Sequence, residues 1–275
     1  MMNRALWTKA INDARLLLGG LVLLMFAFNC LFVWLTSLVD LGAWQFILQS
    51  LPGQLQSLIG VPIAKVATTA GRIGLGYIDP VVLFTLVTWS LARGSDVVSG
   101  EIGRGTMELL LAQPVSRLSL LATHAIVTTV GSALLAASAW AGTYTGLLLT
   151  GLIKEADPAL YVPAAFNLFA ATFFLTAATT LVSAGDSQRW RTLGIVGAFY
   201  VVELILKIVA RMAPNFTWLM YATFLGAFEP QSLVVYPERA WQISLRYDGT
   251  LIGLGLAAYV AAAVVFNRRD IPAPL

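Results

Sequence analysis

Long blocks of apolar residues alternate with short polar segments along most of this chain. A helix rises about 1.5 Å per residue, so roughly 20 apolar residues cross the hydrocarbon core of a bilayer. Lipid offers no hydrogen-bond partner to the backbone, which makes helices the expected form of such blocks. The pattern predicts an all-α integral membrane protein with one domain over 1–275 and six spans, at residues 16–39, 74–91, 118–152, 161–184, 190–209 and 250–266.

Two of these blocks have unusual features. Asp79 and Pro80 interrupt the block 74–91, but Asp followed by Pro commonly starts a helix, so we interpret Asp79 as a helix cap rather than an outer gate residue. The block 118–152 would be about 50 Å long as a helix, which exceeds the hydrocarbon core. Part of that helix is expected to project into the cytosol.

Outside the spans, three segments have the pattern of surface helices. Apolar residues at helical spacing and charged residues on the other faces predict an amphipathic interfacial helix over 4–15. The segment 216–228 carries no charge but is too short to span, which suits a re-entrant or interfacial helix in the outer loop. The loop 40–73 is a candidate for a further surface helix.

Composition excludes a water-soluble globular protein. The 275 residues are 58% hydrophobic and only 11% charged, whereas soluble chains are about a quarter charged. The net charge of +3 is small and its positive residues are scattered, which argues against nucleic-acid binding. The single cysteine, Cys30, lies inside the first apolar block and allows neither an internal disulfide nor a Cys-based metal site.

Lys and Arg residues set the expected orientation, because cytoplasmic loops carry an excess of them. With both termini in the cytosol, the outer loops hold a minority of the positive residues, namely Lys65, Arg72, Lys154, Arg211, Arg239 and Arg246. We therefore expect a multi-pass protein of the plasma membrane, the inner membrane in bacteria, with both termini cytoplasmic.

The cytosolic segment 93–117 predicts one very short helix. Gly103 and Gly105 give a flexible start, Thr106 is a suitable N-cap, and Glu108 lies in the first turn, where the helix dipole favours negative charge. Three leucines follow, and Pro114 prevents continuation. A helix that short is not stable alone, and exposed leucines require a partner surface.

This segment resembles the signature of the ABC-2 type permeases, the transmembrane subunits of a class of ABC exporters. The family pattern runs from an acidic residue through Ser-x-Glu and Gly-Thr-x-Glu to a pair of leucines and Pro-x-Ser-Arg, after the second membrane helix. The matching positions are Asp96, Ser99, Glu101, Gly105, Thr106, Glu108, Leu110, Leu111, Pro114, Ser116 and Arg117. The resemblance implies that these residues, with the flanking Arg104, form a coupling helix that docks in a groove of an ABC ATPase and transmits its motion.

Partners follow from the same resemblance. The chain has no Gly-x4-Gly-Lys-Ser/Thr phosphate loop, so ATP and Mg would be bound by the partner ATPase, and we expect this chain to have no cofactor and no catalytic or metal site. Six spans supply half of a pathway, which implies a second permease copy as a homodimer or related heterodimer, surrounded by membrane lipid.

Within the spans, Glu203 and Lys207 lie four positions apart and therefore on one helix face. They are either an ion pair of the transport pathway, or Lys207 extends outward while Glu203 bonds a neighbouring helix. The single histidine, His124, is interpreted as a polar residue at the membrane boundary rather than a metal ligand. Four aromatic residues of the outer loop are candidate interfacial anchors, namely Trp218, Tyr221, Trp241 and Tyr247.

Three functions remain open from the sequence. The first is an exporter subunit, and the scarcity of charge within the spans favours an amphiphilic substrate such as a lipid or drug. The second is a membrane scaffold or mechanotransmitter that relays ATPase motion to an extracytoplasmic partner without transport. A stand-alone channel or secondary carrier would need more ionisable residues inside the membrane.

Overall fold

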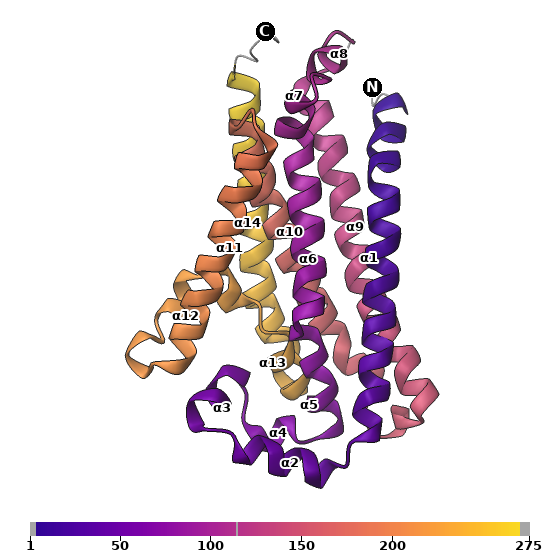
Figure 1. Cartoon of the computed structure of the whole chain (residues 1–275), viewed down its shortest axis with the longest axis vertical. Helices are drawn as coiled ribbons and strands as arrows, with labels where there is room; N and C mark the ends of the chain where they lie inside the picture. Colours follow the sequence, from indigo (N-terminus) through magenta and orange to yellow (C-terminus); the bar gives the residue numbers. More distant parts are fainter. Residues whose placement is uncertain (1–3, 114, 270–275) are drawn as a thin grey trace.

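Six long helices form an elongated bundle with short helices at both ends (Figure 1). The structure is a computed structural model that describes residues 4–113 and 115–269, and those residues form helices, turns and loops without a strand. The long helices are α1 (Arg4–Leu38), α6 (Pro80–Ser95), α9 (Arg117–Thr150), α10 (Val162–Gly185), α11 (Arg189–Met212) and α14 (Ala240–Arg268). Six segments that contain them are long and apolar enough to cross a membrane, which confirms the all-α membrane fold class.

Short elements gather at the two ends of the bundle. At the end where α1 begins and α14 finishes, called here the α8 end, lie the π-helical turn η2 (Asp96–Gly100), α7 (Glu101–Gly103) and α8 (Met107–Leu111) (Figure 1). The first outer loop, at the opposite end, holds α2 (Leu41–Ser50), α3 (Gly53–Ile59), α4 (Ile63–Val66), α5 (Thr69–Gly74) and η1 (Leu75–Ile78). The later connections hold η3 (Leu152–Lys154), η4 (Pro158–Tyr161), η5 (Pro214–Phe216), α12 (Leu219–Ala222), η6 (Phe224–Ala227), α13 (Pro230–Val235) and η7 (Pro237–Arg239).

The predicted spans agree with the long helices except at some boundaries. Asp79 Oδ1 accepts a hydrogen bond from the Val81 amide at 2.9 Å, which confirms Asp79 as the N-cap of α6. The last helix starts at Ala240, ten residues before the expected position 250. Its first turns carry polar side chains, and the buried carboxylate of Asp248 is paired with Asn167 at 2.5 Å, so these turns pack inside the protein instead of breaking the helix.

The separate amphipathic helix expected over residues 4–15 is wrong. Those residues are the first turns of α1, which runs without a break from Arg4 to Leu38 (Figure 1). Leu6, Ala10 and Ala14 are buried within the chain rather than turned toward lipid. Of the apolar stripe that suggested a surface helix, Ala14 is buried, whereas Ile11 is 50% exposed.

The single re-entrant helix expected over 216–228 is also wrong. The chain there forms three separate turns, η5, α12 and η6, because Thr223 adopts an extended backbone (φ −112°, ψ 140°) between α12 and η6. A helix is present in the first outer loop, where the Asp40 carboxylate caps α2 by accepting from the Gly42 amide at 2.8 Å.

Close backbone packing joins α1 to α9 along the bundle. A Cβ atom at Gly142 would lie 2.3 Å from the carbonyl oxygen of Phe26, and one at Gly146 would lie 2.7 Å from Cβ of Val33. Small residues spaced four apart allow membrane helices to approach this closely. Between α6 and α10, hydroxyl groups meet instead, with Ser90 and Thr176 oxygens 3.1 Å apart.

Candidate functional site

The second span does not end in a flexible loop. Beyond Ser95, α6 continues through the π-helical turn η2 into α7. Ser99 holds this extension in place, because its amide donates to Ser183 Oγ at 2.9 Å and its hydroxyl lies 3.1 Å from that of Thr192. Ser99 therefore ties the predicted coupling segment to both α10 and α11.

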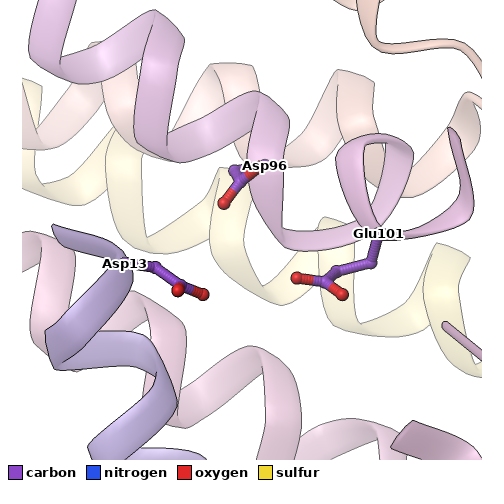
Figure 2. Close-up of side chains that lie close together, drawn as sticks. All are labelled: Asp13, Asp96 and Glu101. Atoms are coloured by element: carbon purple, nitrogen blue, oxygen red, sulfur yellow. The ribbon is translucent and has the colours of Figure 1, made fainter. Parts of the chain in front are cut away.

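Three carboxylates from separate elements converge at this end of the bundle. Asp13 comes from α1, Asp96 from η2 and Glu101 from α7, and Figure 2 shows the carboxylates turned toward one another. Oxygen atoms of the three groups lie within 4.8 Å of one another. Asp96 and Glu101 are buried, whereas Asp13 is exposed.

Basic side chains surround these carboxylates. Lys9 Nζ lies 2.5 Å from Glu101 Oε1 and 3.0 Å from Asp13 Oδ2. Arg104 lies between Asp96 and Glu101, at 2.6 Å from the first and 2.8 Å from the second.

Two further arginines reach Asp96, Arg93 at 3.5 Å and Arg189 of α11 at 3.4 Å. The resulting group is called the α8-end cluster, and it consists of Lys9, Asp13, Arg93, Asp96, Glu101, Arg104 and Arg189. Through it, ion pairs join α1 and α11 to the extension of α6.

The charges of this cluster nearly balance, with four bases facing three acids. Burial alone would lower the pKa of Arg104, but the hydrogen bond and ion pair with Asp96, together with Glu101, outweigh it and raise that pKa. A divalent cation would have to displace bases already in contact with the acids, so the arrangement favours ion pairing over metal binding. A cavity of about 510 Å³ opens beside the cluster and is lined by seven of its members and by Thr106.

His124 belongs to the edge of the same site. An Arg93 guanidinium nitrogen lies 3.1 Å from its Nε2. Since guanidinium can only donate, Nε2 is the acceptor and the neutral ring carries its proton on Nδ1. His124 therefore orients Arg93, in agreement with its interpretation as a polar residue at the boundary.

Thr106 precedes α8 but does not cap it with its side chain. Its backbone is helical (φ −90°, ψ −12°), and its hydroxyl donates to Glu101 Oε2 at 2.5 Å. The capping prediction is wrong because the buried carboxylate competes for the hydroxyl. Gly105 turns the chain between α7 and α8 with φ +69°, a conformation that favours glycine.

The leucines of α8 divide between the protein and its surroundings. Leu110 and Leu111 pack against a core cluster that includes Val97 and Val98, so for these two leucines the required packing surface lies within the chain. Leu109 is 70% exposed. Glu108 beside it is exposed and has no ion pair within residues 4–113 and 115–269.

The last residues of the family-like segment have other surroundings. Arg117 donates to the carbonyl oxygens of Phe266 at 3.0 Å and Arg269 at 2.6 Å, which joins the start of α9 to the end of α14. Ser116 caps α9 by accepting from the Ser119 amide at 3.1 Å. Pro114 lies outside the described residues.

Glu203 and Lys207 of α11 do not pair with each other, and Lys207 is buried rather than extended outward, so neither of the two arrangements expected from their spacing is present. The Glu203 carboxylate accepts from the Phe224 amide at 2.8 Å. Lys207 donates to the carbonyl oxygens of Leu225 at 2.8 Å and Phe228 at 2.6 Å. Both side chains hold the loop that returns from α11, because its irregular backbone leaves polar groups to be satisfied.

A buried carboxylate of that loop completes this second cluster. Both carboxylate oxygens of Glu229 accept from one terminal nitrogen of the Arg211 guanidinium. The carboxylate also lies 3.1 Å from Lys207 Nζ and accepts from the Gln231 amide at 2.7 Å. We call Lys207, Arg211, Glu229 and Gln231 the Glu229 cluster. An apolar cavity of about 180 Å³ lies beside it, lined by residues that include Tyr200 and Phe228.

Sequence reasoning missed several members of the two clusters. Lys9, Asp13, Arg93, Arg189 and Glu229 were not among the predicted site residues. A local signal was present for Lys9 and Asp13, which lie four apart on one helix face, and for Arg93, which lies three positions before Asp96. The other contacts join residues of separate elements.

Comparison with known proteins identifies no relative for this chain. It matches no protein-family profile and no curated protein sequence. The site is therefore interpreted from its own residues and from the resemblance in segment 93–117.

Proposed function

We propose that this chain is the transmembrane subunit of an ATP-driven exporter of the ABC-2 type, and that α8 docks on a separate ATPase. The proposal rests on one observation: α8 is short and exposed, and the segment that leads to it is held in place by ion pairs. α8 projects past the neighbouring long helices with Leu109 and Glu108 exposed (Figure 1). The preceding elements α7 and η2 are joined by ion pairs to α1 and α11, respectively.

The arrangement suggests how motion would be transmitted. A displacement of α8 would pass through the turn at Gly105 into α7, η2 and α6, because these last three elements follow one another as an almost continuous helix. Lys9 and Arg189 would draw α1 and α11 along with it. Such coupling is a rigid-body shift of packed helices, driven by ATP and Mg bound to the partner ATPase.

A relay without transport remains a second candidate function. The polar groups between α6 and α10 are satisfied within the protein: Ser90 meets Thr176, and Thr176 donates to the Thr172 carbonyl at 2.7 Å. Hydroxyls used in this way hold helices together instead of lining a water-filled path. Reconstitution with the ATPase in lipid vesicles distinguishes the exporter from the relay. Only an exporter, acting as one chain or as a pair, would move an amphiphilic lipid or drug across the vesicle membrane.

Site-specific crosslinking tests the docking surface. A photo-reactive residue is placed at Leu109, and as a matched control at Leu55, an exposed leucine of the opposite end. We expect Leu109 in native membranes to crosslink to a protein with a nucleotide-binding phosphate loop, and Leu55 not to. Crosslinking of such an ATPase from Leu55 alone, or from neither position, would contradict the proposal.

The turn before α8 gives a test of coupling itself. Gly105→Ala places a side chain at φ +69°, which costs about 1 kcal/mol and reorients α8, so we expect ATP turnover of the complex to fall about fivefold. Gly103→Ala is the control, because a Cβ there meets nothing within 4 Å. Equal turnover in both variants would show that α8 does not transmit the ATPase cycle.

A further inference from the structure

A second large cavity lies away from both ion-pair clusters. It has a volume of about 540 Å³ and opens between the α12–η6 turns and α14. Its lining includes Thr217, Tyr221, Thr223, Arg246, Tyr247 and Leu254. That size is typical of small-molecule sites, and the wall combines a cation, phenols and hydroxyls with apolar residues.

Arg246 brings an uncompensated positive charge to this cavity. No carboxylate of residues 4–113 and 115–269 forms an ion pair with it. Its guanidinium lies over the Tyr221 ring, 5.9 Å from the centroid, which leaves its N–H groups available. Asp248, two positions along α14, is buried and bonded to Ser244 and Asn167 on another helix face, so it does not neutralise the charge.

The surroundings of the cavity resemble the boundary between lipid tails and headgroups. Trp218, Tyr221 and Trp241 are 59%, 81% and 63% exposed, and aromatic side chains of this kind concentrate at membrane interfaces. From Arg246 the lining continues along α14 to Leu254, which is 48% exposed. A ligand with a polar head and an apolar tail would meet matching surfaces in that order.

One buried group of the wall is also unsatisfied. The hydroxyl of Thr223 is buried and has no hydrogen-bond partner among the described residues. Leaving such a group unpaired is unfavourable, so an additional acceptor or donor at this wall would be favourable. Thr217 and Thr250 add two exposed hydroxyls to the same cavity.

We propose that this cavity binds a phospholipid, with the phosphate on the Arg246 guanidinium and the hydroxyls, and with an acyl chain along Leu251 and Leu254. Arg is well suited to a phosphate because its planar donors reach two oxygens at once. The positive charge of Arg246 selects an anionic group over a cationic one. This site is independent of the proposed docking to an ATPase.

The test measures lipid binding to the purified full chain in detergent. Native mass spectrometry is used to titrate phosphatidylglycerol onto the wild type, Arg246→Gln and Arg239→Gln, the last being a nearby exposed arginine outside the cavity. We expect about tenfold weaker binding for Arg246→Gln, because its charge-assisted contact with the phosphate is lost, and unchanged binding for Arg239→Gln. Diacylglycerol, which lacks the phosphate, should bind no better to the wild type than to Arg246→Gln.

Three outcomes would overturn the proposal. Equal affinity in all three proteins would mean that Arg246 does not bind the headgroup. An equal loss in both variants would indicate general surface charge rather than a site. Complete competition by glycerol phosphate would show that the cavity takes a soluble phosphate compound instead of a lipid. An unchanged unfolding temperature of Arg246→Gln verifies that the protein remains folded.

Discussion

The two charged clusters of this protein differ in how far their side chains are exposed to water. In the α8-end cluster, Asp96 and Glu101 are buried, but Asp13, Lys9, Arg104 and Arg189 keep about 40% of their side chains exposed. In the Glu229 cluster, Lys207 and Arg211 are 11% exposed and the carboxylate 6%. Half-solvated ion pairs exchange partners at low cost, whereas a buried carboxylate between two buried bases cannot lose a partner without a large penalty. The α8-end cluster therefore suits a region whose helices shift relative to one another, and the Glu229 cluster suits a contact that stays fixed.

The largest expected effect comes from breaking the buried cluster. Glu229→Ala leaves Lys207 and Arg211 buried without their carboxylate, so we expect a loss of about 3–5 kcal/mol in the free energy of unfolding. Thermal unfolding in detergent measures it, with the exposed Glu238→Ala as a control that should have little effect. Adding Lys207→Met should recover part of the loss, and a double variant no better than Glu229→Ala would contradict this account of the cluster.

Helix packing gives the next test, because α1 is held by α9 along its length as well as by ion pairs at one end. Gly142→Ala drives a Cβ atom into the Phe26 carbonyl, so we expect a loss of about 1–3 kcal/mol in stability. Gly194→Ala of α11 is the matched control, since a Cβ there meets nothing within 4 Å. If both variants unfold at the same temperature, the close approach of α1 and α9 is not a stabilising feature.

A smaller loss is expected in the half-solvated cluster. Glu101→Gln removes the pairs with Lys9 and Arg104, but water can solvate both bases, so the cost should be about 1–2 kcal/mol. Raising the salt concentration should narrow the difference from the wild type, which calorimetry can follow. A loss as large as that of Glu229→Ala would remove the distinction between the two clusters.

The smallest effect is expected for the ion pair between Asp186 and Arg191, because the Arg191 side chain is 60% exposed. Burial alone would raise the pKa of Asp186, but the Arg191 hydrogen bond and the amides of Gln188 and Ser187 outweigh it and lower that pKa. A lowered pKa stabilises the folded protein above the ordinary value of about 4, and this stabilisation disappears as the pH falls through the lowered value. Asp186→Asn should therefore match the wild type in melts at low pH and differ only slightly at neutral pH.

Local sequence patterns were sufficient for the elements that depend on local rules. Apolar block length gave the long helices, and the Asp79-Pro80 pair gave the start of α6. The short helix α8 lies where the glycines and leucines placed it. Each of these features depends on residues within a few positions of one another.

Tertiary contacts decided what the patterns could not. The apolar stripe before residue 16 was compatible with a membrane surface or with a neighbouring helix, and the pairing of Lys9 with Glu101, 92 positions away, favours the second. Likewise, the spacing of Glu203 and Lys207 permits an ion pair, but each finds a partner in the returning loop. Helical spacing shows which residues share a face and leaves open what that face contacts.

The π-helical turn η2 has a geometric consequence for α8. A π turn accommodates an extra residue relative to an α-helix, and one residue corresponds to a rotation of about 100° around the axis. Glu101 therefore points toward Lys9 only because η2 adds this rotation before α7 begins. A chain one residue shorter between Asp96 and Gly100 would turn α8 to a different direction around the helix axis, so the number of residues in this segment matters as much as their identity.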